Sequence, residues 1–148
     1  MDIKSDIPFV PSSTDRLNTM VELSQVKPGQ KTLDLGSGDG RVVIAMAKAG
    51  AEAHGFEVDP KLVEESKKNI ANEGLEGKAF IHNKSFWDGD LRDFDVITVY
   101  GITSIMGRLE GKLKQELKDG AKIVSNYFTF PNWKPEEVKE KVYLYRKD

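Results

Sequence analysis

Glycines and carboxylates gather in residues 34–40, where the sequence reads Asp-Leu-Gly-Ser-Gly-Asp-Gly. Glycines at this spacing let a backbone bend sharply and approach a bound molecule closely, because they have no Cβ atom. Glu57 follows 23 residues after Asp34. An acidic side chain about 20 residues beyond such a turn is where a ribose is held through its hydroxyls. The pattern therefore predicts a binding site for a ligand that contains a ribose.

The charges around the glycines indicate which ligand to expect. A dinucleotide site has the spacing Gly-x-Gly-x-x-Gly and presents amides to a pyrophosphate. Here the spacing is Gly-x-Gly-x-Gly, with Asp34 before it and Asp39 inside it. Two carboxylates about 4–6 Å from a pyrophosphate would repel it by several kcal/mol. S-adenosylmethionine carries an ammonium, a sulfonium and a carboxylate but no phosphate. We predict that Asp34 binds its ammonium, directly or through water, that the glycine amides bind its carboxylate, and that Glu57 binds its ribose.

A third contact with this cofactor is expected after the third predicted strand, where Ser85 and Phe86 would lie around the adenine. For the neighbouring Trp87, contact with the adenine and packing onto the protein are equally open. The residues predicted to bind the cofactor are Phe9, Val10, Pro11, Asp34, Gly36, Ser37, Gly38, Gly40, Glu57, Val58, Ser85 and Phe86.

The elements that must position these residues follow a strand–helix alternation from residue 31 onward. Strands are predicted at 32–35, 51–58, 78–82, 94–100 and 121–128, and helices at 41–48, 60–73 and 103–118. An earlier amphipathic helix has Ser12 or Ser13 as its N-cap and is expected to stop at Pro28-Gly29. Residues 136–141 and 142–145 read as an antiparallel pair. Strands separated by helices of about 10–15 residues predict parallel βαβ units.

The fold class is therefore α/β: a Rossmann-like, doubly wound sheet, mostly parallel, with an antiparallel C-terminal strand. The 148 residues are expected to form one domain, in which residues 1–30 supply a lid segment and a helix. In such sheets ligands bind beyond the carboxyl ends of the strands. The predicted strands put the glycines and Glu57 at these ends.

Composition excludes several kinds of chemistry. With no cysteine, the chain has no disulfide, no thiolate zinc site and no cysteine nucleophile. With two scattered histidines, no metal site is predicted. A net charge of −2 provides no overall basic field for nucleic acid. Neither a membrane span nor a signal-peptide pattern is found, so we expect a cytoplasmic protein without a membrane partner, and a monomer is favoured.

The segments Thr-Leu-Asp-Leu-Gly-Ser-Gly-Asp-Gly-Arg at 32–41 and Gly-Phe-Glu-Val-Asp-Pro at 55–60 resemble the class I S-adenosylmethionine-dependent methyltransferases. Residues 8–11, 112–117 and 128–133 are similar to the small protein-lysine methyltransferases, which include an archaeal broad-specificity enzyme and mitochondrial enzymes acting on the ATP synthase c-subunit and the adenine nucleotide translocase. The resemblance implies methyl transfer to the ε-amino group of lysines on protein substrates.

Such a reaction needs a deprotonated amine at the mouth of the site. Deprotonating a lysine at pH 7 costs about 4–5 kcal/mol, and an apolar aromatic mouth lowers that cost. Since Tyr127 and Phe128 alternate along a predicted strand, only one of them is expected to face the site. No residue is assigned as a catalytic acid or base. The residues predicted to line the substrate mouth are Tyr100, Tyr127, Phe128 and Trp133.

Other functions stay open at this stage. Enzymes that methylate the amino groups of bases carry Asn/Asp-Pro-Pro-Tyr/Phe after the fourth strand, and residues 99–102 read Val-Tyr-Gly-Ile instead. That difference and the absent basic field argue against RNA. A methyltransferase acting on a small molecule and a non-catalytic S-adenosylmethionine sensor are the remaining alternatives.

Overall fold

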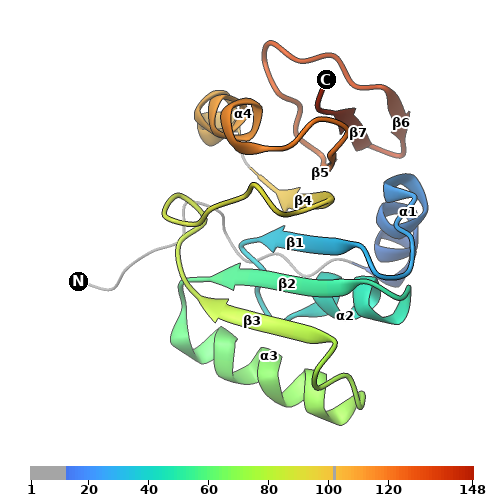
Figure 1. The fold of residues 1–148 in the computed structure, drawn as a ribbon, viewed down its shortest axis with the longest axis vertical. Coiled ribbons are helices and arrows are strands. Elements are labelled where there is room, and N and C mark those ends of the chain that lie inside the picture. Colours follow the sequence, from blue (N-terminus) through green and yellow to red (C-terminus); the bar gives the residue numbers. More distant parts are fainter. Residues whose placement is uncertain (1–12, 102) are drawn as a thin grey trace.

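The computed structural model describes residues 13–101 and 103–148, which form a seven-stranded sheet with helices on both faces (Figure 1). The strands are β1 (Lys31–Leu35), β2 (Glu52–Glu57), β3 (Ala79–Asn83), β4 (Val96–Tyr100), β5 (Lys122–Asn126), β6 (Glu137–Lys139) and β7 (Val142–Arg146). The helices are α1 (Thr14–Ser24), α2 (Arg41–Lys48), α3 (Pro60–Asn72) and α4 (Thr103–Glu116).

The strand order is β3-β2-β1-β4-β5-β7-β6. Strands β1 to β5 pair in parallel, β7 is antiparallel to β5, and β6 is antiparallel to β7. The predicted fold class is thus confirmed, including the antiparallel end of the sheet. The order reverses between β1 and β4, which is where ligands bind in sheets of this kind.

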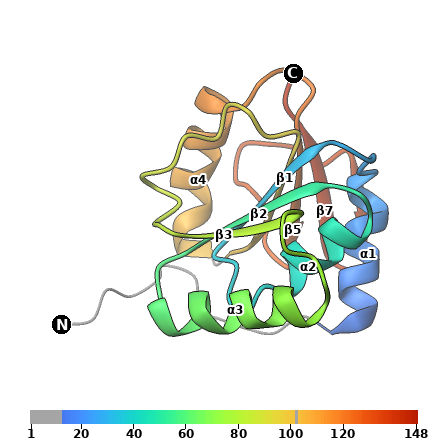
Figure 2. The same ribbon diagram turned by 60° about the horizontal axis from the view of Figure 1, so that its bottom comes forward.

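Two layers of helix cover the sheet. Figure 2 shows α1, α2 and α3 together on one face and α4 on the other. On the α4 face, Leu33 and Ile97 of the sheet share a fully buried core with Leu109 and Leu113. Because side chains alternate along a strand, the intervening Asp34 and Thr98 point to the opposite face.

Local signals set where the helices begin and end. Ser13 is the N-cap of α1, with its hydroxyl accepting a hydrogen bond from the Arg16 amide at 3.2 Å. Asp59 caps α3 in the same way, and Pro60 is the first residue of that helix. The expected stop of α1 at Pro28-Gly29 is wrong by a few residues, because Gln25 adopts a left-handed conformation (φ 51°) and ends the helix after Ser24.

Within the described residues, no helix has the length and apolar character needed to cross a membrane. Equally, no cluster of three or more histidine, aspartate or glutamate side chains suited to a metal ion occurs in residues 13–101 and 103–148.

Candidate cofactor and acceptor site

The glycine loop joins β1 to α2 and is bound to the end of β2. The amides of Gly36 and Ser37 both donate to the Phe56 carbonyl at 2.9 Å, and the amide of Gly40 donates to the Ser37 carbonyl at 3.0 Å. Gly36, Gly38 and Gly40 have φ values of 75°, 57° and 89°, a region that residues with a Cβ atom seldom adopt. The glycines are therefore needed for the shape of the turn.

Two close approaches fix how the loop lies on its neighbours. A Cβ atom on Gly40 would come within 3.2 Å of Ser66 in α3, and one on Gly55 would come within 2.5 Å of Ser37. The side chains of Ser37 and Val43 thus both pack against Gly55, and the Ser37 hydroxyl is the one buried side-chain polar atom without a hydrogen-bond partner in the described part of the chain. Of the predicted cofactor ligands, Ser37 and Gly40 serve the packing of the loop.

Glu57 braces the loop from the end of β2. Its Oε1 accepts a hydrogen bond from the Gly38 amide at 2.8 Å, its Oε2 accepts one from the Asp59 amide at 3.0 Å, and the residue is only 4% exposed. A carboxylate has about four lone-pair positions, so it can still accept hydrogen bonds from two ribose hydroxyls. Val58 follows it in a half-buried position.

The prediction that the glycine amides bind the cofactor's carboxylate stays a prediction, and the structure gives these amides partners within the protein. The amides of Gly36, Gly38 and Gly40 already donate to Phe56, Glu57 and Ser37 respectively. An N–H group has a single hydrogen to donate, so these three amides are used within the protein. The glycines allow a ligand to approach the loop closely, while their amides hold the shape of the loop.

Asp34 lies in the middle of the sheet at the end of β1. It is buried, and its Oδ1 accepts a hydrogen bond from the Thr98 hydroxyl at 2.7 Å. Burial, the main cause, and the nearby Glu57 raise the pKa of Asp34 to about 8, although the Thr98 hydrogen bond lowers it. No lysine or arginine of the described residues forms an ion pair with it. A buried carboxyl group without a cation fits a ligand that brings one, as the ammonium of S-adenosylmethionine does.

Asp39 has a different role from the one predicted. Its Oδ2 lies 2.8 Å from Nε of Arg41, and its Oδ1 accepts a hydrogen bond from the Arg41 amide at 3.3 Å. The charge of Asp39 is thus paired within the loop. The electrostatic argument against a pyrophosphate therefore loses Asp39, and Asp34, which holds its proton up to about pH 8, adds to it only above that pH.

The segment after β3 is folded onto the sheet. The Ser85 hydroxyl accepts a hydrogen bond from the Trp87 amide at 3.2 Å and so closes a turn. The predicted cofactor ligand Phe86 is 5% exposed and belongs to the α4-side core. Trp87 is half-buried against that core, with the Arg108 guanidinium 3.9 Å from its ring centroid. Packing onto the protein thus accounts for both aromatic rings.

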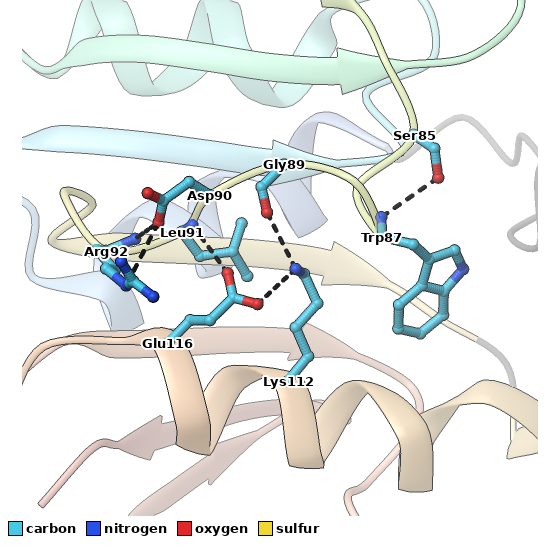
Figure 3. Close-up of polar contacts among 8 residues, drawn as sticks. All are labelled: Ser85, Trp87, Gly89, Asp90, Leu91, Arg92, Lys112 and Glu116. Carbon is cyan, nitrogen blue, oxygen red and sulfur yellow. Dashed lines mark hydrogen bonds and ion pairs between the residues drawn. The ribbon is translucent and has the colours of Figure 1, made fainter.

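Helix α4 holds this segment with an ion pair that the sequence reading missed. The Lys112 ammonium donates to the Gly89 carbonyl at 3.0 Å and lies 2.6 Å from Oε2 of Glu116 (Figure 3). Oε1 of Glu116 in turn accepts a hydrogen bond from the Leu91 amide at 3.2 Å. The available signal was the spacing of four residues between lysine and glutamate along the predicted helix, which puts them on the same side of it.

A second ion pair on α4 holds the segment after β5. Oε1 of Glu110 accepts a hydrogen bond from the Asn132 amide at 2.8 Å, and the Lys114 ammonium bridges Oε2 of Glu110 and the Asn132 carbonyl, each at 3.1 Å. Trp133 follows directly and packs against Phe130 and Tyr145.

The prediction that Trp133 lines the substrate mouth is wrong. Lys114 lies over its ring at 5.1 Å and stands 11 residues after the first residue of α4, which is about 16 Å along a helix. Tyr145, which also contacts it, pairs with Ile123 near the start of β5. Trp133 is therefore directed toward the end of the sheet opposite to the glycine loop.

Tyr100 and Tyr127 do meet, at the carboxyl ends of β4 and β5. Their ring centroids are 5.4 Å apart in an edge-to-face arrangement, and Tyr127 is 41% exposed. Burial raises the pKa of Tyr100. The Arg16 guanidinium of α1 lies 3.9 Å from the Tyr127 centroid and donates hydrogen bonds to Asn126 and Glu140. Arg16 was absent from the sequence reading, because 110 residues separate it from Asn126.

The predicted alternation of Tyr127 and Phe128 is also wrong. Strand β5 ends at Asn126, and Tyr127 has a left-handed backbone with φ 65°. Its amide donates to the Lys141 carbonyl at 2.7 Å, and the Phe128 carbonyl accepts a hydrogen bond from the Ser125 hydroxyl at 2.6 Å. Phe128 turns onto the α4-side core while Tyr127 stays exposed. The remaining predicted cofactor ligands, Phe9, Val10 and Pro11, lie outside the described residues.

Comparison with known proteins identifies the family. The family model of the ANTKMT methyltransferase domain matches residues 34–137. The chain belongs to this methyltransferase family. S-adenosylmethionine is the family's cofactor, in agreement with the acidic side chains Asp34 and Glu57 and with a solved relative that contains S-adenosyl-L-homocysteine.

Two curated relatives of this methyltransferase act on lysine, according to their names. The chain is 34% identical to the protein-lysine N-methyltransferase of Saccharolobus islandicus, over 89% of this chain and 83% of that protein. It is 38% identical to the ATP synthase c-subunit lysine N-methyltransferase of Rattus norvegicus, over 89% of this chain and 61% of that protein. The chain thus spans about three fifths of the length of the rat relative.

Among solved structures, an RNA methyltransferase from Salinibacter ruber in complex with S-adenosyl-L-homocysteine is 32% identical, with a TM-score of 0.86 over 93% of this chain and 92% of that one. A methyltransferase from Thiobacillus denitrificans, at 21% identity and a TM-score of 0.69, shares the fold.

Proposed function

We propose that this methyltransferase transfers the methyl group of S-adenosylmethionine to the ε-amino group of lysine side chains in proteins. The observation that carries the proposal is the Tyr100–Tyr127 pair, which lies at the carboxyl ends of β4 and β5, and β4 is the neighbour of β1, the strand that leads into the glycine loop. Ring faces attract an ammonium group, and a partly desolvated place disfavours its charged form. A lysine can therefore be guided in and lose its proton there.

The contribution of this chain to the reaction is alignment. When bound, the cofactor supplies a methyl group already activated by the sulfonium. Glu57 and the loop that it braces hold the ribose end, and Asp34 holds the ammonium end. With both ends fixed, the chain has to place one amine in line with the methyl group and exclude water. We assign no acid or base to take up the lysine proton, which can leave to solvent from an open mouth.

The named functions of the relatives support a lysine acceptor. Both the archaeal protein, of which this chain covers 83%, and the rat protein are lysine N-methyltransferases. The cytoplasm stays our expectation for where the enzyme works.

RNA is the second candidate acceptor, because the Salinibacter ruber structure with a TM-score of 0.86 is that of an RNA methyltransferase. The net charge of −2 and the sequence Val-Tyr-Gly-Ile at 99–102 speak against it. RNA binding draws most of its affinity from cationic contacts with phosphates, and amino-methylating enzymes need a different segment at this place.

The two acceptors can be separated by one labelling experiment. The purified protein is incubated with tritiated S-adenosylmethionine and a cell lysate, which is then split and treated with protease or with ribonuclease. We expect protease-sensitive label that mass spectrometry assigns to lysines. Label that only ribonuclease removes would contradict the lysine proposal. Glu57→Ala should abolish the signal, and the matched control Glu64→Ala, an exposed residue of α3, should leave it unchanged.

A further inference from the structure

Thr98 lies beside Asp34 in the sheet and donates a hydrogen bond to its carboxyl group. The two residues are direct partners in the register of β4 and β1. Thr98 is 1% exposed and Asp34 7%, and the hydroxyl-to-carboxylate distance is 2.7 Å. The hydroxyl is bound to one carboxylate oxygen, Oδ1. A threonine has a stiff side chain with few rotamers, so the hydrogen bond fixes the orientation of the carboxyl group.

We propose that Thr98 is a positioning residue of the cofactor site, which fixes Oδ1 of Asp34 and leaves Oδ2 to receive the ammonium group of S-adenosylmethionine. The inference deepens the proposed function, since it concerns the same cofactor. It goes beyond that function in assigning a role to a residue that does not itself need to touch the ligand.

The surroundings of Asp34 make capture of the cofactor a proton-coupled event. Glu57 from β2 is the charged group whose field acts on Asp34, whereas Asp39 and Arg41 at the start of α2 are paired with each other. The buried side chains that α1 and α2 contribute are uncharged: Thr19, Met20, Leu23, Ser24, Val43, Met46 and Ala47.

With no cation paired to it among the described residues, Asp34 keeps its proton up to about pH 8. When the cofactor's ammonium arrives, the Asp34 carboxylic acid releases that proton to solvent, and the carboxylate pairs with the ammonium. Charge and protons balance in this exchange. Thr98 lowers the pKa of Asp34 by donating to the carboxylate, so removing its hydroxyl should make the proton harder to release.

The test is the affinity of Thr98→Val for S-adenosylhomocysteine, which retains the ammonium, measured by calorimetry between pH 6 and 9. At pH 7 we expect a loss of about tenfold, the usual worth of a hydrogen bond to a charged group. The loss should shrink above pH 8, where wild-type Asp34 is already ionised. Because both proteins bind the same ligand, its own ionisation cancels in the ratio of their affinities. Thr98→Ser should restore wild-type affinity.

A matched control is Thr32→Val. Thr32 is a buried threonine two residues before Asp34 on the same strand, and its replacement should leave the affinity ratio near one at every pH. Thermal unfolding of each variant checks that the fold persists. Equal affinity of Thr98→Val and wild type at all pH values would overturn the positioning role while the proposed function stands. If wild type itself fails to bind S-adenosylhomocysteine, the proposed function fails instead.

Discussion

The two halves of the site are built in different ways. The cofactor half, formed by residues 34–40, Glu57 and Asp34 with Thr98, is held by hydrogen bonds among the ends of neighbouring strands, to which the Phe56 carbonyl and the side chains of Glu57 and Thr98 contribute. The acceptor half, formed by Tyr100 and Tyr127, is held by segments that are distant in the sequence, with Arg16 of α1 stacked on one ring and the Lys141 carbonyl bound to the Tyr127 amide. Since Arg16 and Tyr127 take no part in the hydrogen bonds that hold the cofactor half, we expect that the acceptor half can change without disturbing the cofactor.

The largest expected effect is on the cofactor half, in Glu57→Ala. The change removes the acceptor for two amides, those of Gly38 and Asp59, and a buried amide left without a partner costs about 1–3 kcal/mol. We expect binding of S-adenosylhomocysteine to fall at least about 100-fold and the urea midpoint to drop. Glu57→Gln, which can still accept one of these hydrogen bonds, should retain more stability. Retained affinity in the alanine variant would show that the loop does not depend on this brace.

Asp34→Asn should separate binding from stability within the same half. A carboxyl group whose pKa is about 8 in the folded protein and ordinarily 3.8 keeps a proton that the unfolded chain has released between these values. Wild-type stability must therefore fall as the pH rises from about 4 to about 8. Asparagine carries no such proton and can still accept from Thr98.

Urea unfolding without cofactor should thus show the Asp34→Asn variant gaining on wild type as the pH increases, by on the order of 1–3 kcal/mol at pH 8. S-adenosylhomocysteine binding should meanwhile be lost. A stability difference that is the same at pH 5 and pH 8 would mean that Asp34 is ionised in the free protein.

The sequence reading was accurate where local signals act. Helix α2 has the predicted bounds, because glycines precede and follow it, and Asp59-Pro60 correctly begins α3. Glu57 could be found from its spacing to Asp34. The partners of these groups could not be found, since a residue type does not say which hydrogen bond it makes. Glu57 accepts a hydrogen bond from the loop and can also bind a ligand. Thr98 donates a hydrogen bond to Asp34, from which it is separated by 64 residues in the sequence.

The acceptor half was predicted less well for a related reason. Tyr100 and Tyr127 were identified from their place at strand ends, but the end of β5 depends on a left-handed residue, Tyr127, that the Lys141 carbonyl stabilises from another strand pair. Trp133 was misplaced because the Glu110–Lys114 pair on α4 draws its segment along the helix. Such long-range side-chain contacts leave no periodic trace in the sequence.

The two ion pairs of α4 allow a test, with an effect of intermediate size, of whether the cofactor half and the acceptor half depend on each other. Lys112→Met removes the hydrogen bond to the Gly89 carbonyl and the ion pair with Glu116. We expect this change to loosen residues 85–91 and so to weaken cofactor binding several-fold. Lys114→Met acts on Asn132 and should leave that affinity unchanged. Calorimetry with S-adenosylhomocysteine on both variants decides this. Equal losses would mean that α4 couples the two segments.

The smallest expected effect, and the sharpest test of the acceptor half, is Tyr127→Asn. Asparagine tolerates the left-handed backbone at this position (φ 65°), so the variant removes the ring and keeps the turn. An exposed cation–π contact contributes about 0.5–1 kcal/mol, which corresponds to a rise in the acceptor KM of about twofold to fivefold with an unchanged cofactor Kd.

The matched variant is Trp133→Leu, which removes a ring that packs on Phe130 and Tyr145. It should lower the melting temperature and leave the acceptor KM unchanged, because its ring lies away from the mouth. The opposite outcome, with Trp133 controlling KM and Tyr127 having no influence, would place the acceptor beside α4 and end the distinction between the two halves.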